Sequence, residues 1–209
     1  MTTVANEIIK FARSKLGTIV KYKPTKTGKC EELVYAALDY ANARKGLRII
    51  NVQTGDIVIF ANQSGKVIIE VIASAQGKKY SVLEYYASST RSNHIAIVSK
   101  APDKNGKIFV LEQNSGKLKS VTESPVNTRN KVSYSKSFPA NTSFTVFKKE
   151  YITFIEAEFT KEETNEVVNN LKTWKGLEEW FNSQVKYSFM ISVSYTGLGT
   201  IEYYRPEKN

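Results

Sequence analysis

The sequence predicts an α+β fold in which a short helix carrying a cysteine packs against an antiparallel, partly barrel-like sheet. Apolar residues follow Cys30 at positions 33, 34, 37, 38 and 41, which is helical spacing. Further along the chain, β-branched runs bounded by turn residues are typical of strands. Two of these runs flank the turn cluster 101–106 and predict an antiparallel hairpin.

The length and composition are those of a globular protein with one sizeable core. The chain has 209 residues, 41% of them hydrophobic, with 12 Tyr and 10 Phe. We expect a core domain over residues 1–149 and an α+β extension over 150–209. The extension is expected to pack on the core, because roughly 50 residues form only a marginal independent domain.

The N-terminal part is predicted to be helical. Residues 6–16 carry apolar side chains at helical spacing, and Gly17 follows as a C-cap. A polar loop over 21–29 then leads to the helix that begins at Cys30, which we expect to end near Lys45, before Gly46.

Strands dominate the rest of the prediction. The expected strands are 57–60, 67–73, 79–86, 95–99, 107–112, 144–147, 151–159, 185–195 and 201–204. Residues 114–142 are rich in Ser, Lys, Asn and Thr and are expected to form a long loop. A helical stripe is expected from Val167, Val168, Leu171, Trp174, Leu177 and Phe181. With a turn at Gly197–Gly199, the extension is expected to be β-α-β-β.

The charge balance favours anionic partners. Lys and Arg outnumber Asp and Glu by 30 to 20, a formal net charge of +10. Lys is scattered with no Arg-rich block, so we expect no nucleic-acid partner. No apolar run is long enough to span a bilayer, and residues 1–7 lack the apolar region of a signal peptide. We expect a monomer that is not addressed to the secretory route.

The sequence offers few metal ligands. The chain has one cysteine and one histidine, which exclude an internal disulfide and a site built from several histidines. We therefore expect neither a metal nor an organic cofactor.

The single cysteine and the single histidine have the chemistry of a nucleophile and its base. Cys30 begins a helix, where backbone N–H groups favour the thiolate. His94 opens the predicted strand 95–99, which pairs with 107–112 in the hairpin. Counting from a turn near Asp103 places His94 opposite the stretch from Glu112 to Asn114. Either residue could orient the imidazole, as the third group of a triad does.

The chain then resembles NlpC-type and CHAP cell-wall hydrolases, which are papain-like cysteine peptidases and amidases. The residues that carry the resemblance cover about 6–115 and stand in the family's order: Gly17, Tyr22, Cys30-x-x-Leu33-Val34-Tyr35, Gly55-Asp56-Ile57-Val58-Ile59-Phe60, His94-Ile95-Ala96-Ile97-Val98 and Glu112-Gln113-Asn114.

The resemblance implies a papain-like core and a role for each matched polar residue. Cys30 would be the nucleophile, His94 the base, and Glu112 or Asn114 the orienting residue. Tyr22 and the Cys30 backbone N–H would bind the oxyanion, although Tyr22 as a packed aromatic is an equally good interpretation. The implied substrate is a peptide linkage in peptidoglycan. The site of action would be the bacterial cell wall, for a phage lysin, an injected effector or a trimmed exported enzyme.

The sequence departs from the family in ways that keep other functions open. Lys29 precedes the thiol and Glu31-Glu32 follow it, and these carboxylates would raise the pKa of the thiol unless they point away. A non-catalytic binding module on the same scaffold is therefore one alternative. A lipid acyltransferase of related fold is another, but that branch places histidine before cysteine. Residues 61–90 are an excursion, and 150–209 have no counterpart in the family.

Overall fold

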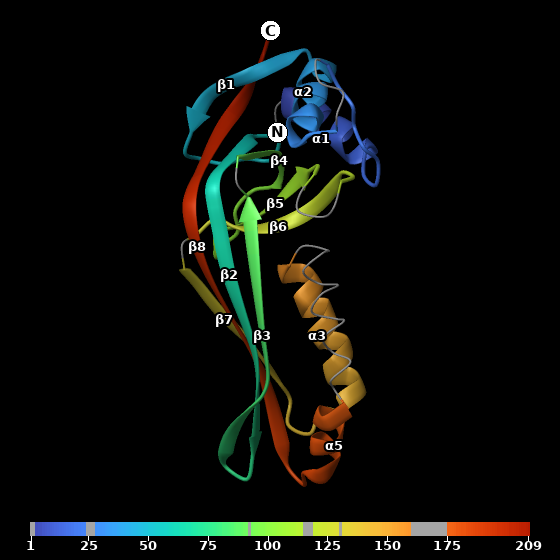
Figure 1. Cartoon of the computed structure of the whole chain (residues 1–209), viewed down its shortest axis with the longest axis vertical. Helices are drawn as coiled ribbons and strands as arrows, with labels where there is room; N and C mark the ends of the chain where they lie inside the picture. Colours follow the sequence, from blue (N-terminus) through green and yellow to red (C-terminus); the bar gives the residue numbers. More distant parts are fainter. Residues whose placement is uncertain (1–2, 24–27, 92, 115–118, 130, 160–174) are drawn as a thin grey trace. The chain divides into compact units, whose positions relative to one another are not determined.

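The computed structural model of the protein describes residues 3–23, 28–91, 93–114, 119–129, 131–159 and 175–209 (Figure 1). The chain folds into two compact units. Unit 1 comprises Met1–Gly65, Ser89–Arg129 and Gly197–Asn209, and unit 2 comprises Lys66–Ser88 and Asn130–Thr196. This partition differs from the predicted division between residues 149 and 150. The difference arises because three long strands contribute residues to both units: β2 (Ile57–Ala75), β3 (Lys78–Arg91) and β8 (Tyr187–Lys208).

Unit 1 contains the two predicted N-terminal helices, α1 (Thr3–Ser14) and α2 (Cys30–Tyr40). α2 begins at Cys30 as predicted, but it ends before the expected boundary near Lys45. Asn42 adopts φ 46°, a left-handed conformation that asparagine tolerates and that terminates a helix. The chain then forms β1 (Ala43–Ile49), which pairs antiparallel with the end of β8.

The strands form one antiparallel eight-stranded sheet that does not close on itself. Its order is β1-β8-β2-β4-β5-β6, with β3 (Lys78–Arg91) paired to β2 and β7 (Lys131–Phe138) paired to β8. The predicted hairpin is confirmed by β4 (His94–Lys100) and β5 (Lys107–Glu112), in which Ile97 lies opposite Leu111. The predicted α+β class with an antiparallel sheet is therefore confirmed.

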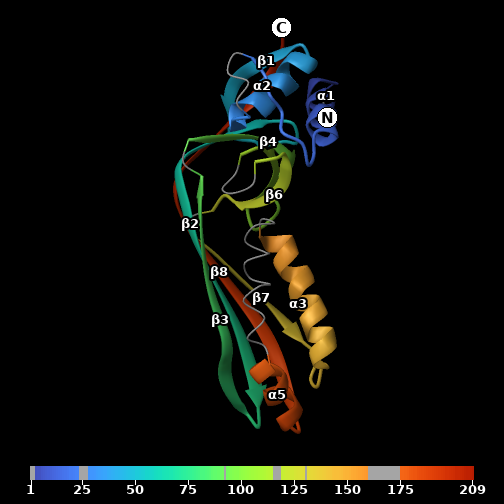
Figure 2. The same ribbon diagram turned by 45° about the vertical axis from the view of Figure 1, so that its right-hand side comes forward.

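The sheet of unit 1 buries both of its faces. Ile57, Ile97 and Leu111 pack with α1 and α2, which lie side by side next to β4 (Figures 1 and 2). Their neighbours along the same strands point to the opposite face, because side chains alternate along a strand. That second apolar cluster contains Val58, Phe60, Ala96, Val98, Ile108, Val110 and Val126.

Unit 2 has an aromatic core, and its helices correct one sequence prediction. The predicted strands 144–147 and 151–159 are a single helix, α3 (Phe144–Glu158), followed later by α5 (Lys175–Ser183). The aromatic and β-branched composition had favoured strands. The helix begins because Ser143 Oγ accepts a hydrogen bond from Val146 N, and it buries Phe147, Tyr151 and Ile155 at four-residue spacing.

Other elements also differ from the prediction. The expected loop over 114–142 contains β6 (Thr122–Asn127) and β7. The expected turn at Gly197–Gly199 lies within the continuous β8, so the β-α-β-β order of the extension is wrong. Residues 57–60 and 67–73 belong to one strand, β2, which turns into β3 through Gln76 and Gly77, both at positive φ. Within the predicted helical stripe, Val167 to Trp174 lie outside the described residues.

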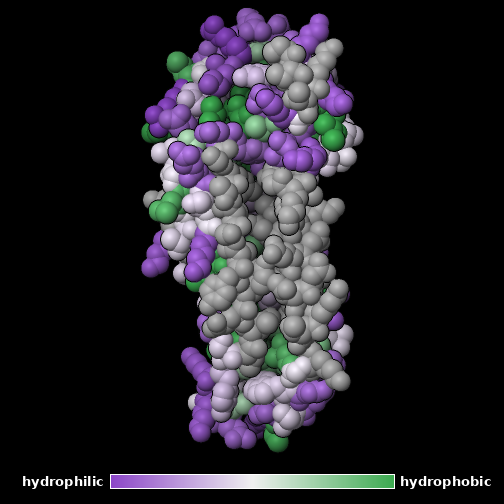
Figure 3. Space-filling model, viewed as in Figure 1, coloured by the Kyte–Doolittle hydropathy of each residue, from purple (hydrophilic) through white to green (hydrophobic). Residues whose placement is uncertain are grey.

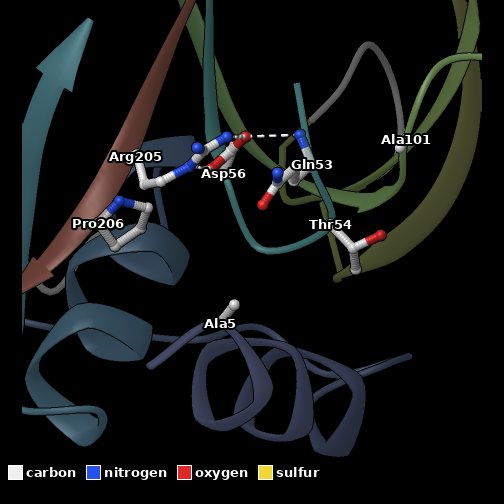
Figure 4. Close-up of a pocket in the computed structure, with 7 residues that line it drawn as sticks. All are labelled: Ala5, Gln53, Thr54, Asp56, Ala101, Arg205 and Pro206. Carbon is white, nitrogen blue, oxygen red and sulfur yellow. Dashed lines mark hydrogen bonds and ion pairs between the residues drawn. The ribbon is translucent and has the colours of Figure 1, made fainter. Parts of the chain in front are cut away.

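A buried ion pair connects the last strand of unit 1 to the start of β2. Asp56 accepts hydrogen bonds from Arg205 Nε and Nη2, both at 3.1 Å, and from the Gln53 backbone N–H at 2.6 Å (Figure 4). The backbone bond closes the turn that leads into β2. Together with Ala5 of α1, these residues line a pocket of about 340 Å³. The Asp56 side chain is 3% exposed, so these donors stabilise the carboxylate in place of water.

We predict that Arg205→Met destabilises the protein much more than Arg44→Met. Arg205→Met leaves a buried carboxylate short of two donors and is expected to cost about 2–3 kcal/mol in the free energy of unfolding. Arg44 pairs with Glu207 at 3.4 Å on the surface, where such a pair contributes less than about 1 kcal/mol. Urea unfolding followed by circular dichroism measures both, and equal losses would contradict the prediction.

Candidate active site

The site begins at the N-terminus of α2, where Cys30 is half-buried. The face of α2 that carries Cys30 also carries Leu33, Val34 and Ala37, which are buried against Ile97 and Leu111. This packing turns the thiol towards β4, the strand that His94 begins. The helix therefore presents Cys30 to the histidine because of its apolar spacing.

His94 is held between two acidic groups. Its Nε2 lies 2.9 Å from Glu112 Oε2, and the imidazole also hydrogen-bonds the Cys30 thiol. Since Nε2 faces Glu112, Nδ1 is the ring nitrogen left for the thiol. The imidazole is 7% exposed and the Glu112 carboxylate 0%, so water does not compete for their contact. The ring also stacks on Phe60, the residue opposite His94 in the sheet.

The contacts shift both pKa values towards an ion pair. Burial alone would lower the pKa of His94, but hydrogen bonds and charges from Cys30 and Glu112 raise it from 6.5 to about 9. Burial would raise the pKa of the Cys30 thiol, but His94 and the Ile95 backbone N–H lower it below its usual value. Both shifts favour the charged pair of thiolate and imidazolium over the neutral pair.

Glu31 and Glu32 follow Cys30 in sequence but behave differently. Glu31 Oε2 lies 4.0 Å from Cys30 Sγ, and its charge opposes the fall in the pKa of the thiol. Glu32 is 1% exposed and accepts hydrogen bonds from the backbone N–H groups of Tyr22 at 2.6 Å and Gly28 at 3.0 Å. The expected repulsion therefore comes from Glu31, while Glu32 supports the loop before the helix.

The structure brings together Cys30, His94 and Glu112, but it does not bring Asn114 or Tyr22 to them. Asn114 Oδ1 accepts a hydrogen bond from Lys119 Nζ at 2.8 Å. The Tyr22 hydroxyl hydrogen-bonds Asp39, which raises the pKa of Tyr22. Asp39 is nine residues after Cys30, roughly 14 Å along α2 and half a turn around it. The Tyr22 hydroxyl thus lies on the far side of the helix from the thiol, and it offers no oxyanion contact in this arrangement.

Sequence reasoning missed two polar residues that support the site. Glu32 occupies the third position of α2, where a carboxylate commonly caps the preceding backbone, and that pattern could have identified it. Gln113 is fully buried and hydrogen-bonds the backbone of Val20 and Lys29. No local signal reveals Gln113, because its partners lie more than eighty residues away in sequence.

Neither the rest of the described structure nor the known proteins add an assignment for the site. Among the described residues, no group of His, Cys, Asp and Glu could hold a metal ion, and no helix is long and apolar enough to cross a bilayer. No protein-family model matches the chain, no curated protein matches its sequence, and no solved structure matches its fold.

We predict that two carboxylates shift the reactivity of Cys30 in opposite directions. Glu31→Gln removes a nearby negative charge, so iodoacetamide should alkylate Cys30 at lower pH than in the wild type. Glu112→Gln removes the charge that stabilises the imidazolium, so alkylation should require higher pH. The midpoint of the alkylation rate against pH measures both shifts. A shift in the same direction for both variants would refute the proposed electrostatics.

Proposed function

We propose that the protein is a cysteine hydrolase that cleaves amide bonds through an acyl-enzyme. The observation that carries the proposal is the contact of a helix-terminal thiol with a buried histidine that is itself bonded to a buried carboxylate. The pKa shifts of Cys30 and His94 supply a thiolate nucleophile and a proton donor together. This is the chemistry that acyl transfer from an amide requires.

The proposed reaction has two halves. The Cys30 thiolate attacks the carbonyl carbon, and the imidazolium of His94 gives its proton to the departing amine as the C–N bond breaks. His94, now neutral, then takes a proton from water as that water attacks the thioester. Collapse of the second intermediate releases the acid and restores the thiolate and the imidazolium.

The other groups of the site stabilise these steps. Glu112 holds the ring through Nε2, which keeps the other nitrogen towards the thiol. The Cys30 backbone N–H lies in the first turn of α2, where N–H groups have no acceptor within the helix, and it can donate to the oxyanion. Tyr22 is left out of this step because its hydroxyl contacts Asp39.

Charge and resemblance support a substrate among acidic wall peptides. Unit 1 holds 19 Lys and Arg against 10 Asp and Glu, whereas unit 2 holds 11 against 10, so almost all of the excess positive charge lies in the unit with the thiol. Hydrophilic residues cover much of the surface around α1 and α2 (Figure 3). The excess of Lys and Arg in unit 1 attracts anionic polymers. The resemblance to NlpC-type and CHAP enzymes makes peptidoglycan the first substrate to test.

We predict that Cys30→Ser abolishes hydrolysis of purified muropeptides, with a loss of at least about 10³-fold. The reason is that a serine hydroxyl is a much weaker acid than a thiol, so His94 and Glu112 do not ionise it. Glu112→Gln should lose on the order of 10²-fold or more, because the imidazolium loses its partner. Asn114→Ala, a control two residues after Glu112, should retain activity. Product analysis by mass spectrometry gives the rates, and turnover by Cys30→Ser would remove the thiol from the mechanism.

We also predict a bell-shaped dependence of kcat/KM on pH. Activity should rise as the thiol ionises and should fall above about 9, where the imidazolium of His94 loses its proton. In Glu112→Gln the upper limb should move to lower pH, because the carboxylate that raises the pKa of His94 is gone. If the upper limb does not move in Glu112→Gln, a group other than His94 controls the loss of activity at high pH.

A further inference from the structure

The side chain of Gln113 uses both of its polar atoms on backbone groups from two other segments. Its Oε1 accepts a hydrogen bond from Val20 N at 2.6 Å. Its Nε2 donates to Val20 O at 2.9 Å and to Lys29 O at 3.0 Å. The side chain is fully buried, so without these bonds its polar atoms would have no hydrogen-bond partner in water.

Gln113 follows directly after the strand residue that contacts His94, and its own side chain contacts the residue before Cys30. Glu112 is the last residue of β5 and contacts His94, and Gln113 follows directly. The Gln113 side chain reaches the helical side of the sheet, where it bonds the backbone of Val20 and Lys29. There it holds the carbonyl of Lys29, the residue that precedes Cys30 and caps α2. Two consecutive side chains thus hold the base and the N-terminus of the nucleophile helix.

Other contacts already fix the loop that Gln113 touches at Val20. Gly17 N donates to Val121 O at 2.9 Å, and Val121 N donates to Thr18 O at 2.7 Å. On the other side of Val20, the Tyr22 N–H is held by Glu32. The bond to Lys29 O has a different consequence, because it joins the N-terminus of α2 to the end of β5.

We propose that Gln113 is a positioning residue of the proposed hydrolase, which keeps Cys30 Sγ within hydrogen-bond distance of His94 by fixing Lys29 against β5. The inference rests on the proposed function. Gln113 touches neither the reacting atoms nor a substrate. Its effect passes through α2, whose first residue is displaced when Lys29 moves. A small displacement matters because the thiol and the imidazole stabilise each other's charge only at short range.

Two variants and one control test the proposal in the full chain. Gln113→Asn keeps a neutral amide but is one methylene group too short to bond both Val20 and Lys29, and Gln113→Leu removes every polar contact. Both replacements are neutral, because a carboxylate near the N-terminus of α2 would itself raise the pKa of the thiol. The control is Ile108→Ala, which truncates a fully buried side chain in β5, the strand before Gln113, on the face away from α2. For each protein we would measure the melting temperature, the pH midpoint of Cys30 alkylation, and kcat and KM on muropeptides.

The expected result is a selective loss in the Gln113 variants. The alkylation midpoint should rise by about half a pH unit or more, and kcat should fall at least about tenfold with KM nearly unchanged. Ile108→Ala should lower the melting temperature without moving the midpoint. If Gln113→Leu does not fold, Gln113→Asn alone decides the outcome. An unchanged alkylation midpoint and kcat in Gln113→Asn, or equal shifts in Ile108→Ala, would show that Gln113 has only a structural role.

The wild-type measurement separates this inference from the proposed function. If wild-type Cys30 alkylates only at the pH of an ordinary thiol, near 8.5, and no muropeptide is cleaved, the proposed hydrolase itself is overturned. If the wild-type midpoint is low and the Gln113 variants share it, only the positioning role is overturned.

Discussion

The carboxylate of Glu112 has no exposure to water, so it must be paired with a donor inside the protein. This constraint determines the arrangement at the end of the sheet that faces the thiol. An unpaired charge in such a place would cost several kcal/mol, so folding must deliver a donor to it. Pairing of β4 with β5 brings His94 within 2.9 Å, and the imidazole becomes easier to protonate. The protonated ring then favours the Cys30 thiolate. The lowered pKa of the thiol thus follows from the same strand pairing that gives a buried carboxylate its partner.

The two carboxylates after Cys30 show how position along a helix decides an electrostatic effect. Glu32 accepts hydrogen bonds from backbone N–H groups of the preceding loop, so its charge stabilises that loop. Glu31 stays beside the sulfur and disfavours the thiolate. The thiol pKa is nevertheless lowered, because contact with His94 and the Ile95 N–H outweighs one carboxylate at 4.0 Å. A site with such a balance responds strongly to any neighbouring change in charge.

The sequence predicts the parts of the protein that depend on local pattern. The helix at Cys30 and the hairpin from His94 to Glu112 follow from spacing and turn chemistry. α3 escapes the prediction because aromatic and β-branched residues are compatible with a strand until a cap at Ser143 and burial at every fourth residue favour the helix. β1 escapes it because its partner, β8, comes at the other end of the chain. The sequence could not decide between Glu112 and Asn114, because the answer depends on the path of the chain after β5. It could not predict the contact of Tyr22 with Asp39, because that contact depends on the conformation of the loop before α2.

Unit 1 is assembled from three separate stretches of chain, the last of which is Gly197–Asn209. This stretch supplies the neighbour of β1 in the sheet and the guanidinium for Asp56. During synthesis, Cys30 and His94 therefore leave the ribosome long before the unit that holds them can be completed. An emerging chain carries Cys30 in an incomplete unit until Gly197–Asn209 has been synthesised. The order of synthesis thus delays the assembly of the contacts around the thiol.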